Sequence, residues 1–382
     1  LKEKGKIGFV LPAEILQVSY AQQLREFLAH FYNKINIVSF KKLVFPDIQQ
    51  EVVLLLCEKN GTDSHLIEHL ELTDASELES LDVNKLKSPQ KQIDFKSNKW
   101  TFYFLEQEEI DFLETVARKK SIPQIADYAK VEVGITTGAN DYFTVPLPVV
   151  EGYNLQEFAK PMVGRSVQVN SIIFNEEDWQ RNRLTKARSH LLIFPPKKKL
   201  NGHKGAKSYI SMGESQGINK GYKTGIRDDW FVVPSIRQSE TLFIRRNNLY
   251  PKLILNEVGA YTTDTMHRVF VKPSTNIKAF VASFYNSLSL AFSEISGRSY
   301  GGGVLELMPS EAGKILLPYA EENETLLDQV DKMMRAKKPI DEILKITNEQ
   351  ILKKGYGFTD KEIKLADSIW KKLSARRLNR NK

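Results

Sequence analysis

The sequence predicts an α/β unit, then a mixed α+β domain, and then a helical C-terminal region. Three observations lead to this fold class. Within residues 1–60, apolar runs of strand length surround one amphipathic helical pattern. Residues 131–318 hold many short apolar runs separated by Gly and Pro, which is typical of a domain with short strands. Residues 319–382 carry apolar positions at helical spacing. Residues 61–130, which begin with a polar and acidic stretch, are expected to connect the first two units.

The first unit is expected to be the end of a larger sheet. Its predicted elements are a strand, a helix capped by Ser19, a strand, a turn and a strand, at residues 5–11, 19–32, 35–40, 45–47 and 52–57. The last strand is an unbroken apolar run, which favours burial on both faces. The helix is expected to bury Leu24, Phe27, Leu28 and Phe31. Almost nothing precedes the first strand and no Met begins the chain, so we expect the opening half of the sheet to lie upstream.

The later regions contain several defined elements. Short strands are predicted at residues 189–194, 230–233, 241–244, 252–256 and 267–271. A single interior helix is predicted at residues 277–294. Thr359 is expected to cap the last helix, because Glu362 stands at the capping-box position. The basic end, residues 376–382, is expected to be a solvated tail.

Composition restricts the classes of protein to consider. Apolar residues make up 41% of 382 residues and the mean hydropathy is −0.35, values that are typical of a globular protein. No run of 18 apolar residues occurs, so we expect no membrane span and a cytoplasmic location. Cys57 is the only cysteine, which excludes disulfides and cysteine zinc sites within the chain. We expect no metal site, and we interpret the spaced pair His65 and His69 as solvated.

Positive charge is concentrated in the middle of the chain. The net charge is +8 overall, but residues 181–252 carry 16 Lys and Arg against four Asp and Glu, a net of +12. Residues 61–120 carry eight Lys and Arg against 13 Asp and Glu, a net of −5. A concentrated basic segment favours a polyanion such as duplex DNA, and the alternative is a solvated surface.

The basic segment supplies most candidate binding residues. Lysines beside small polar residues suit phosphate contacts, and the candidates are Lys197, Lys198, Lys199, Lys204, Lys207, Lys220 and Lys223. Arginines suit base edges, and the candidates are Arg227, Arg245 and Arg246. No glycine-rich dinucleotide or nucleotide-phosphate loop and no His-Glu-x-x-His motif occurs. We therefore assign no catalytic or cofactor-binding residue within the chain.

Several segments, taken in order, resemble the TaqI-like gamma class of N6-adenine DNA methyltransferases. The first is Gly5-Lys6-Ile7-Gly8-Phe9-Val10-Leu11-Pro12, which is similar to a late strand of that family's Rossmann-like sheet. The pair Val44-Phe45 and the run Glu51–Leu56 resemble its closing hairpin. Segments that resemble its target-recognition domain are Val133–Phe143, Leu255–Tyr261, Gly297–Leu307 and Pro309–Ala312.

The resemblance implies a function and a division of the chain. It implies methyl transfer from S-adenosylmethionine to the amine of a flipped adenine in duplex DNA. Residues 1–60 would end the catalytic domain, and residues 131–318 would form the target-recognition domain. Asn140 and the pair Arg298 and Tyr300 are then expected in loops near DNA, the latter because glycines 301–303 allow close backbone approach. For Asn140, the alternative is a turn in which Gly138 and Asn140 adopt positive φ.

The family's cofactor loop and catalytic motif precede its late strand, and neither occurs here. We therefore expect the chain to be a fragment or one piece of a split enzyme, inactive alone, whose partners are duplex DNA and the missing catalytic half. Two alternatives remain at this point. One is a non-enzymatic DNA-binding or specificity protein that works with a separate catalytic chain. The other is a methyltransferase–endonuclease fusion.

Overall fold

The structure is a computed structural model. It describes residues 1–379 except for residues 3, 46, 48–49, 60, 82–88, 94–98, 120, 201 and 301. The centre of the turn expected at 45–47, the first glycine of the 301–303 run and the last three residues of the basic tail lie outside the described residues.

The N-terminal unit is a five-stranded mixed sheet. Its strands stand in the order β1-β3-β2-β4-β5, with β1 and β2 antiparallel to β3, and β4 parallel to β2. Their bounds are Lys6–Pro12, Lys34–Phe40, Val52–Glu58, Leu66–Leu72 and Lys91–Gln92 for β1 to β5. The three strands predicted in residues 1–60 are present. The sheet, however, continues through β4 and β5, past the boundary that was expected at residue 60.

Helix α1 (Gln22–Phe31) connects β1 to β2 and packs on the sheet through Leu28 and Ala29. Two sequence predictions about this helix are wrong. A 3-10 turn occupies residues 19–21, so α1 begins after Ala21 and Ser19 does not cap it. Leu24 and Phe27, expected inside, are 47% and 58% exposed. The spacing was helical, but the hydrophobic stripe is wider than the face that the sheet covers.

A second five-stranded sheet lies at the centre of the molecule. Its order is β6-β14-β11-β13-β9, antiparallel except for the parallel pair β9 and β13. The bounds are Ala129–Val133, Met266–Val271, Thr241–Ile244, Leu253–Asn256 and Ile173–Phe174 in that order. Three of these strands match the sequence predictions. The strand predicted at 230–233 is absent, because Trp230, Phe231 and Val233 instead fill the core of the neighbouring lobe from a turn.

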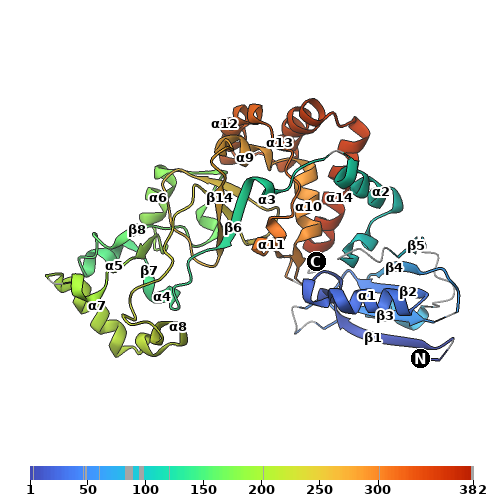
Figure 1. The fold of residues 1–382 in the computed structure, drawn as a ribbon, viewed down its shortest axis with the longest axis horizontal. Coiled ribbons are helices and arrows are strands. Elements are labelled where there is room, and N and C mark those ends of the chain that lie inside the picture. Colours follow the sequence, from blue (N-terminus) through green and yellow to red (C-terminus); the bar gives the residue numbers. More distant parts are fainter. Residues whose placement is uncertain are drawn as a thin grey trace.

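That lobe is built on a three-stranded sheet, β7-β10-β8 (Thr144–Val145, His190–Leu192 and Ala159–Pro161). Short helices surround it: α4 (Asn140–Phe143), α5 (Leu147–Gly152), α6 (Glu176–Arg183), α7 (Lys204–Ser215) and α8 (Tyr222–Gly225). Closely packed aromatic rings, including Tyr142, Tyr209 and Trp230, form its centre. In Figure 1, α7 and α8 lie at one end of the molecule and the β1–β5 sheet lies at the other.

Helices join the central sheet to the N-terminal unit. They are α2 (Gln107–Lys119), α3 (Ile125–Tyr128), α9 (Ile277–Ser283), α10 (Ser287–Ser296) and α11 (Pro309–Ala312), then α12 (Leu327–Arg335), α13 (Ile340–Thr347) and α14 (Asp360–Leu378). The single helix predicted at 277–294 is two helices. The first ends at Ser283, and Asn286 caps the second, since its side chain accepts from the amide of Ser289 at 2.9 Å.

The C-terminal helix α14 crosses between the units and packs along the fully buried α10 (Figure 1). It begins as predicted: Thr359 accepts from the amide of Glu362 at 3.2 Å, and Glu362 accepts from the amide of Thr359 at 2.7 Å. A three-stranded sheet, β12-β16-β15 (Arg246–Asn247, Leu305–Glu306, Arg298–Ser299), lies beside the other end of this helix pair. Among the described residues, no helix is long and apolar enough to cross a membrane.

Candidate nucleic-acid interface

The seven lysines predicted to contact phosphates all lie in the outer lobe, and all are exposed. Lys197–Lys199 form a 3-10 turn after β10, and Lys204 and Lys207 lie in the first turn of α7. Lys220 precedes α8 and Lys223 lies within it. Within the described part of the chain, none of the seven forms an ion pair with a carboxylate. Their charge is therefore available to a polyanion.

Hydrogen bonds of its backbone amides, and not of the lysine side chains, hold the lysine turn. The amide of Lys197 donates to Asp229 Oδ2 at 2.9 Å, and the amide of Lys199 donates to the carbonyl of Pro196 at 2.8 Å. The backbone of the turn is therefore held in place, while the three ammonium groups remain in solvent. Such a turn suits contacts with a phosphate backbone, which read no sequence.

Arg227 has a different environment from these lysines. Its guanidinium donates to the carbonyl of Thr137 at 2.7 Å and to the carbonyl of Trp230 at 3.3 Å. Burial lowers the pKa of Arg227 from its ordinary value. Its predicted contact with a base edge thus competes with two bonds that hold the loop at Thr137.

Asn140 lies in the same loop. It accepts from the Thr137 hydroxyl and donates to Asp264 Oδ1 at 3.0 Å. Gly138 has φ of +83°, and a Cβ there would stand 2.9 Å from Lys223 Cβ, so the loop lies directly against α8. The alternative interpretation was a turn in which both Gly138 and Asn140 adopt positive φ. The positive φ is present at Gly138 but not at Asn140, which begins α4.

Three of the candidate residues form hydrogen bonds with the buried carboxylate of Glu306. Arg245 and Arg246 each donate through Nε to Oε1 at 3.0 Å, and the Tyr300 hydroxyl donates to Oε2 at 2.9 Å. Burial favours a raised pKa for Glu306, but these hydrogen bonds and the two guanidinium charges lower it below its ordinary value. Arg245 also donates to the carbonyl of Asp264 at 3.2 Å.

The hairpin that carries Tyr300 is also joined to the N-terminal unit. Ser299 donates from its amide to Gln17 Oε1 and accepts from Gln17 Nε2, both at 3.0 Å. Arg298, predicted near DNA, donates through Nε to Glu311 Oε1 at 2.9 Å. Its charge is therefore paired within the protein.

A continuous path of contacts results from these bonds. It runs from α8 through the loop at Thr137 and Asn140 to Asp264, then through Arg245 and Glu306 to the Tyr300 hairpin, and on to Gln17. The path joins the outer lobe to the N-terminal unit. The structure thus connects Arg227, Arg245 and Arg246 with Asn140 and Tyr300, and Arg298 lies in the Tyr300 hairpin itself, while the lysines form a separate exposed group.

Sequence reasoning missed the residues that organise this path. Arg377, expected in a solvated tail, is 1% exposed. It pairs with Glu294 of α10 at 2.7 Å and donates to the carbonyl of Gly303 in the Tyr300 hairpin. The Arg376 side chain is only 10% exposed, and it pairs with Glu51 at 2.7 Å and Glu71 at 3.0 Å from the N-terminal unit. The prediction of a solvated tail is therefore wrong for these residues. Only their position on the inner face of a long helix could have indicated this.

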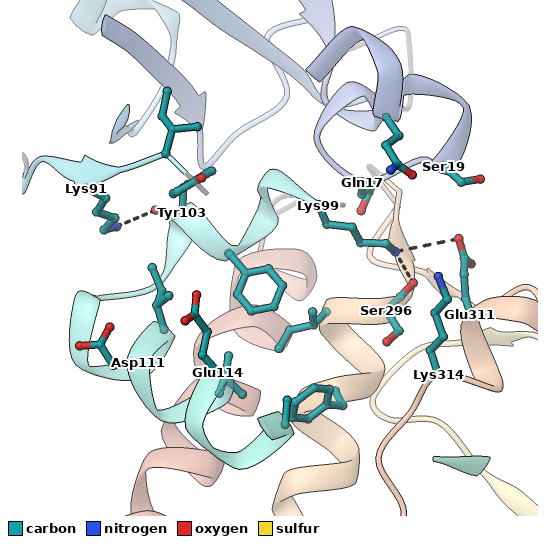
Figure 2. Close-up of a pocket in the computed structure, with 18 of the residues that line it drawn as sticks. Gln17, Ser19, Lys91, Lys99, Tyr103, Asp111, Glu114, Ser296, Glu311 and Lys314 are labelled. Atoms are coloured by element: carbon teal, nitrogen blue, oxygen red, sulfur yellow. Dashed lines mark hydrogen bonds and ion pairs between the residues drawn. The ribbon is translucent and has the colours of Figure 1, made fainter. Parts of the chain in front are cut away.

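A cavity of about 530 Å³ lies where the N-terminal unit meets α2, α10 and α11 (Figure 2). Lys99 projects across it and donates to the carbonyl of Ser296, with Glu311 at 4.0 Å. Burial lowers the pKa of Lys99 to about 8, although the Glu311 carboxylate opposes this. Acidic and basic side chains both line the cavity: Lys91, Lys99, Lys314, Asp111, Glu114 and Glu311. Its charge selects no single class of ionic ligand. Among the described residues, no cluster of side chains suited to a metal ion occurs.

Comparisons with known proteins agree on one family. The sequence model described as "Type II methyltransferase M.Eco57I, C-terminal domain" matches residues 97–352. The Type II methyltransferase M.AccI of Acinetobacter calcoaceticus is 24% identical over 330 residues, which cover 82% of this chain and 59% of that protein. The chain therefore spans about three fifths of the length of this curated relative.

Solved structures of restriction-modification enzymes align with this chain at low sequence identity. The Type IIL restriction-modification enzyme MmeI, solved in complex with DNA, aligns over 97% of this chain and 50% of its own with a TM-score of 0.57 at 8% identity. The type IIG restriction endonuclease BpuSI aligns over 100% of this chain and 48% of its own with a TM-score of 0.49 at 11% identity. The mixed α/β architecture is thus similar to that of MmeI.

Proposed function

Because the chain belongs to the family of the C-terminal domain of the Type II methyltransferase M.Eco57I, we propose that it is the DNA-recognising part of a site-specific DNA methyltransferase in a restriction-modification system. The parent enzyme transfers a methyl group from S-adenosylmethionine to N6 of adenine in duplex DNA. This part binds the duplex and reads the target. The observation that carries the proposal is the set of seven exposed lysines without ion-pair partners among the described residues.

The catalytic half belongs at the outer edge of β1. That strand pairs only with β3 in the described sheet, and its Val10 is 63% exposed. Natural proteins seldom leave a seven-residue apolar edge strand uncovered, because it invites pairing with another strand. Tyr20, in the 3-10 turn before α1, is 77% exposed and is a second uncovered apolar side chain of this unit. A further strand of a Rossmann-like sheet therefore fits beside β1, from the same or a separate chain.

S-adenosylmethionine is assigned no site in this chain. In the described structure, β1 leads directly into a 3-10 turn at Ala13, and β2 and β4 are followed by Lys41 and Thr73. None of these turns is the glycine-rich turn that carries a cofactor in such sheets. We therefore expect the purified chain to incorporate no methyl groups into DNA. Labelled methyl transfer by the isolated chain would contradict this division of the enzyme.

The first test concerns the lysine turn. Replacing Lys197, Lys198 and Lys199 by Ala should weaken binding to duplex DNA, because phosphate contacts are lost. Each lost contact should also reduce the steepness of the plot of log affinity against log salt by about 0.9. A matched control is the Ala triple at Lys332, Lys338 and Lys345, which removes equal charge from exposed positions near α12 and α13. Equal affinities and salt slopes for the two triples would refute the assignment of the lysine turn to DNA.

The second test asks whether the chain reads sequence. Duplexes bound by the purified chain are selected from a random pool at low and near-physiological salt, and then sequenced. Enrichment of one short sequence that contains adenine would support target recognition by this part. Salt-sensitive binding without enrichment would mean that readout requires the catalytic half as well.

A further inference from the structure

The tip of the outer lobe presents two large apolar side chains to solvent. Tyr222 and Ile226 are 86% and 75% exposed and stand four residues apart in and directly after α8. Residues four apart in a helical turn lie on the same side of it. A single exposed apolar residue needs no explanation, but an aromatic ring beside a branched aliphatic side chain forms a small protruding apolar surface.

This tip is held rigidly by the protein beneath it. Thr224 is fully buried between the two exposed residues, and its hydroxyl donates to the carbonyls of Ile218 and Gly221. The segment enters through Gly217, whose φ of +75° favours glycine, and it ends at Arg227, which is bonded to the loop at Thr137. A surface that is already ordered loses little conformational entropy when it binds.

The surroundings of the tip are basic. Lys220 and Lys223 stand on either side of Tyr222, both exposed, and neither pairs with a carboxylate in the described part of the chain. No Asp or Glu occurs between Gln216 and Arg227. The complementary partner of such a tip is a polyanion that also offers apolar or aromatic faces. Duplex DNA has both, with phosphates on the outside and stacked bases within.

We propose that Tyr222 and Ile226 form a wedge that inserts between base steps of bound duplex DNA while Lys220 and Lys223 hold the flanking phosphates. Proteins that unstack a duplex commonly insert apolar side chains in this way, and the kink is repaid by additional contacts. A tyrosine ring stacks on any base, so the wedge is expected to tolerate sequence. It adjoins the loop of Asn140, because Lys223 touches Gly138 and α8 lies beside α4 (Figure 1).

The inference rests on the proposed function but makes a separate claim. Phosphate contacts depend on salt, whereas stacking and apolar insertion depend on it little. Substitution of the wedge should therefore lower affinity without changing the salt slope, and substitution of Lys220 and Lys223 should reduce the slope. A protein partner at this tip would instead leave DNA binding unchanged in the Tyr222→Ala, Ile226→Ala double variant.

The test uses the full chain and a 30-base-pair duplex that carries 2-aminopurine as a reporter of unstacking. The same duplex is prepared with a central T·T mismatch, which costs less to unstack. The unchanged chain should raise the fluorescence and bind the mismatched duplex more tightly. The double variant should lose the fluorescence rise and the mismatch preference, with affinity lowered by roughly 5- to 150-fold, the range that one lost stacking contact supplies.

Two further variants keep the interpretation specific. Val167→Ala with Leu184→Ala removes two side chains that are 80% and 82% exposed elsewhere, and it should behave like the unchanged chain. Tyr222→Trp should retain stacking and the fluorescence rise. If the unchanged chain binds DNA and the double variant matches it in affinity, fluorescence and mismatch preference, the wedge is refuted and the proposed function stands. If the unchanged chain binds no duplex even at low salt, both are refuted.

Discussion

Replacing Arg377 by Met tests whether the C-terminal helix is a structural centre of the molecule. The Arg377 guanidinium forms two hydrogen bonds with Glu294, at 2.7 and 3.1 Å, and donates to the backbone carbonyls of Gly303, Asn248 and Leu249. The side chains of Arg377 and Glu294 are only 1% and 3% exposed. Met fills similar space but leaves the carboxylate without a counter-charge.

The size of the effect follows from burial. Removing one partner of a buried pair costs about 3–5 kcal/mol, because the remaining charge is neither solvated nor paired. Three backbone carbonyls lose their donor as well, so we expect the upper part of that range. The matched control is Lys361→Met on the same helix. Lys361 pairs with Glu108 at 2.8 Å, but both side chains are exposed, so the control should cost about 0–1 kcal/mol.

The loss should depend on pH in a defined direction. Burial already raises the pKa of Glu294 from its ordinary value of 4.5, and Arg377 opposes that shift. Without Arg377 the pKa rises further. A carboxyl whose pKa is raised on folding stabilises the folded state below its unfolded pKa, and that stability is lost as the pH rises through the folded pKa. The cost of Arg377→Met should therefore be larger at pH 8 than at pH 5.

Urea unfolding, followed through tryptophan fluorescence, measures the free energy of unfolding at both pH values. The double variant Glu294→Met, Arg377→Met should recover most of the loss at pH 8, since no charge is then left buried. The reasoning would be refuted by a variant as stable as the unchanged chain at pH 8, or by a loss that does not grow between pH 5 and pH 8.

Two more predictions concern single buried groups. Glu306→Gln should lower the free energy of unfolding by about 1.5–3 kcal/mol at pH 7, because its bonds to Arg245 and Arg246 become weaker. Since the pKa of Glu306 is lowered in the folded chain, this difference should shrink as the pH falls through that pKa. A difference in urea midpoint that stays constant with pH would contradict the prediction. Cys57 is 2% exposed, and burial raises the pKa of its thiol to about 12. A thiol reagent at pH 8 should therefore label it only after unfolding, as read by mass spectrometry. Rapid labelling of the native chain would show that Cys57 is accessible to solvent and would contradict the prediction.

Local patterns were sufficient to predict most strands but not their arrangement. Thr241–Ile244 is a strand with the bounds that its apolar run indicated, and Thr359 caps α14 as its motif required. The insertion of β3 between β1 and β2, and the addition of β4 beyond them, depend on which edges meet in space. Alternation of side chains says which face of a strand is buried but not which strand lies next to it.

The candidate site shows the same limit at the level of side chains. An exposed lysine turn could be predicted from Lys197–Lys199, because three consecutive lysines cannot be buried together. The pairing of Arg245 with Glu306 and of Arg376 with Glu51 could not, since these partners lie 61 and 325 residues apart. Residue type indicated a polar group in each case, and only the fold shows whether that group faces solvent or another side chain.

Lysine and arginine side chains have different environments in the candidate interface. The lysines are exposed and without ion-pair partners in the described residues, whereas Arg245, Arg246 and Arg298 are bonded to buried carboxylates and Arg227 to backbone carbonyls. This division follows from their chemistry: an ammonium is strongly hydrated and stays in water, while a planar guanidinium can satisfy several fixed acceptors at once. Lysine substitutions should consequently change the salt dependence of DNA binding. Arginine substitutions should instead shift the loops at Thr137 and Tyr300 and so change which sequence is preferred. Selection of bound duplexes by an Arg245→Lys variant separates these effects, because the variant keeps the charge and loses the paired geometry. An unchanged sequence preference for this variant would contradict the role of Arg245 in sequence readout.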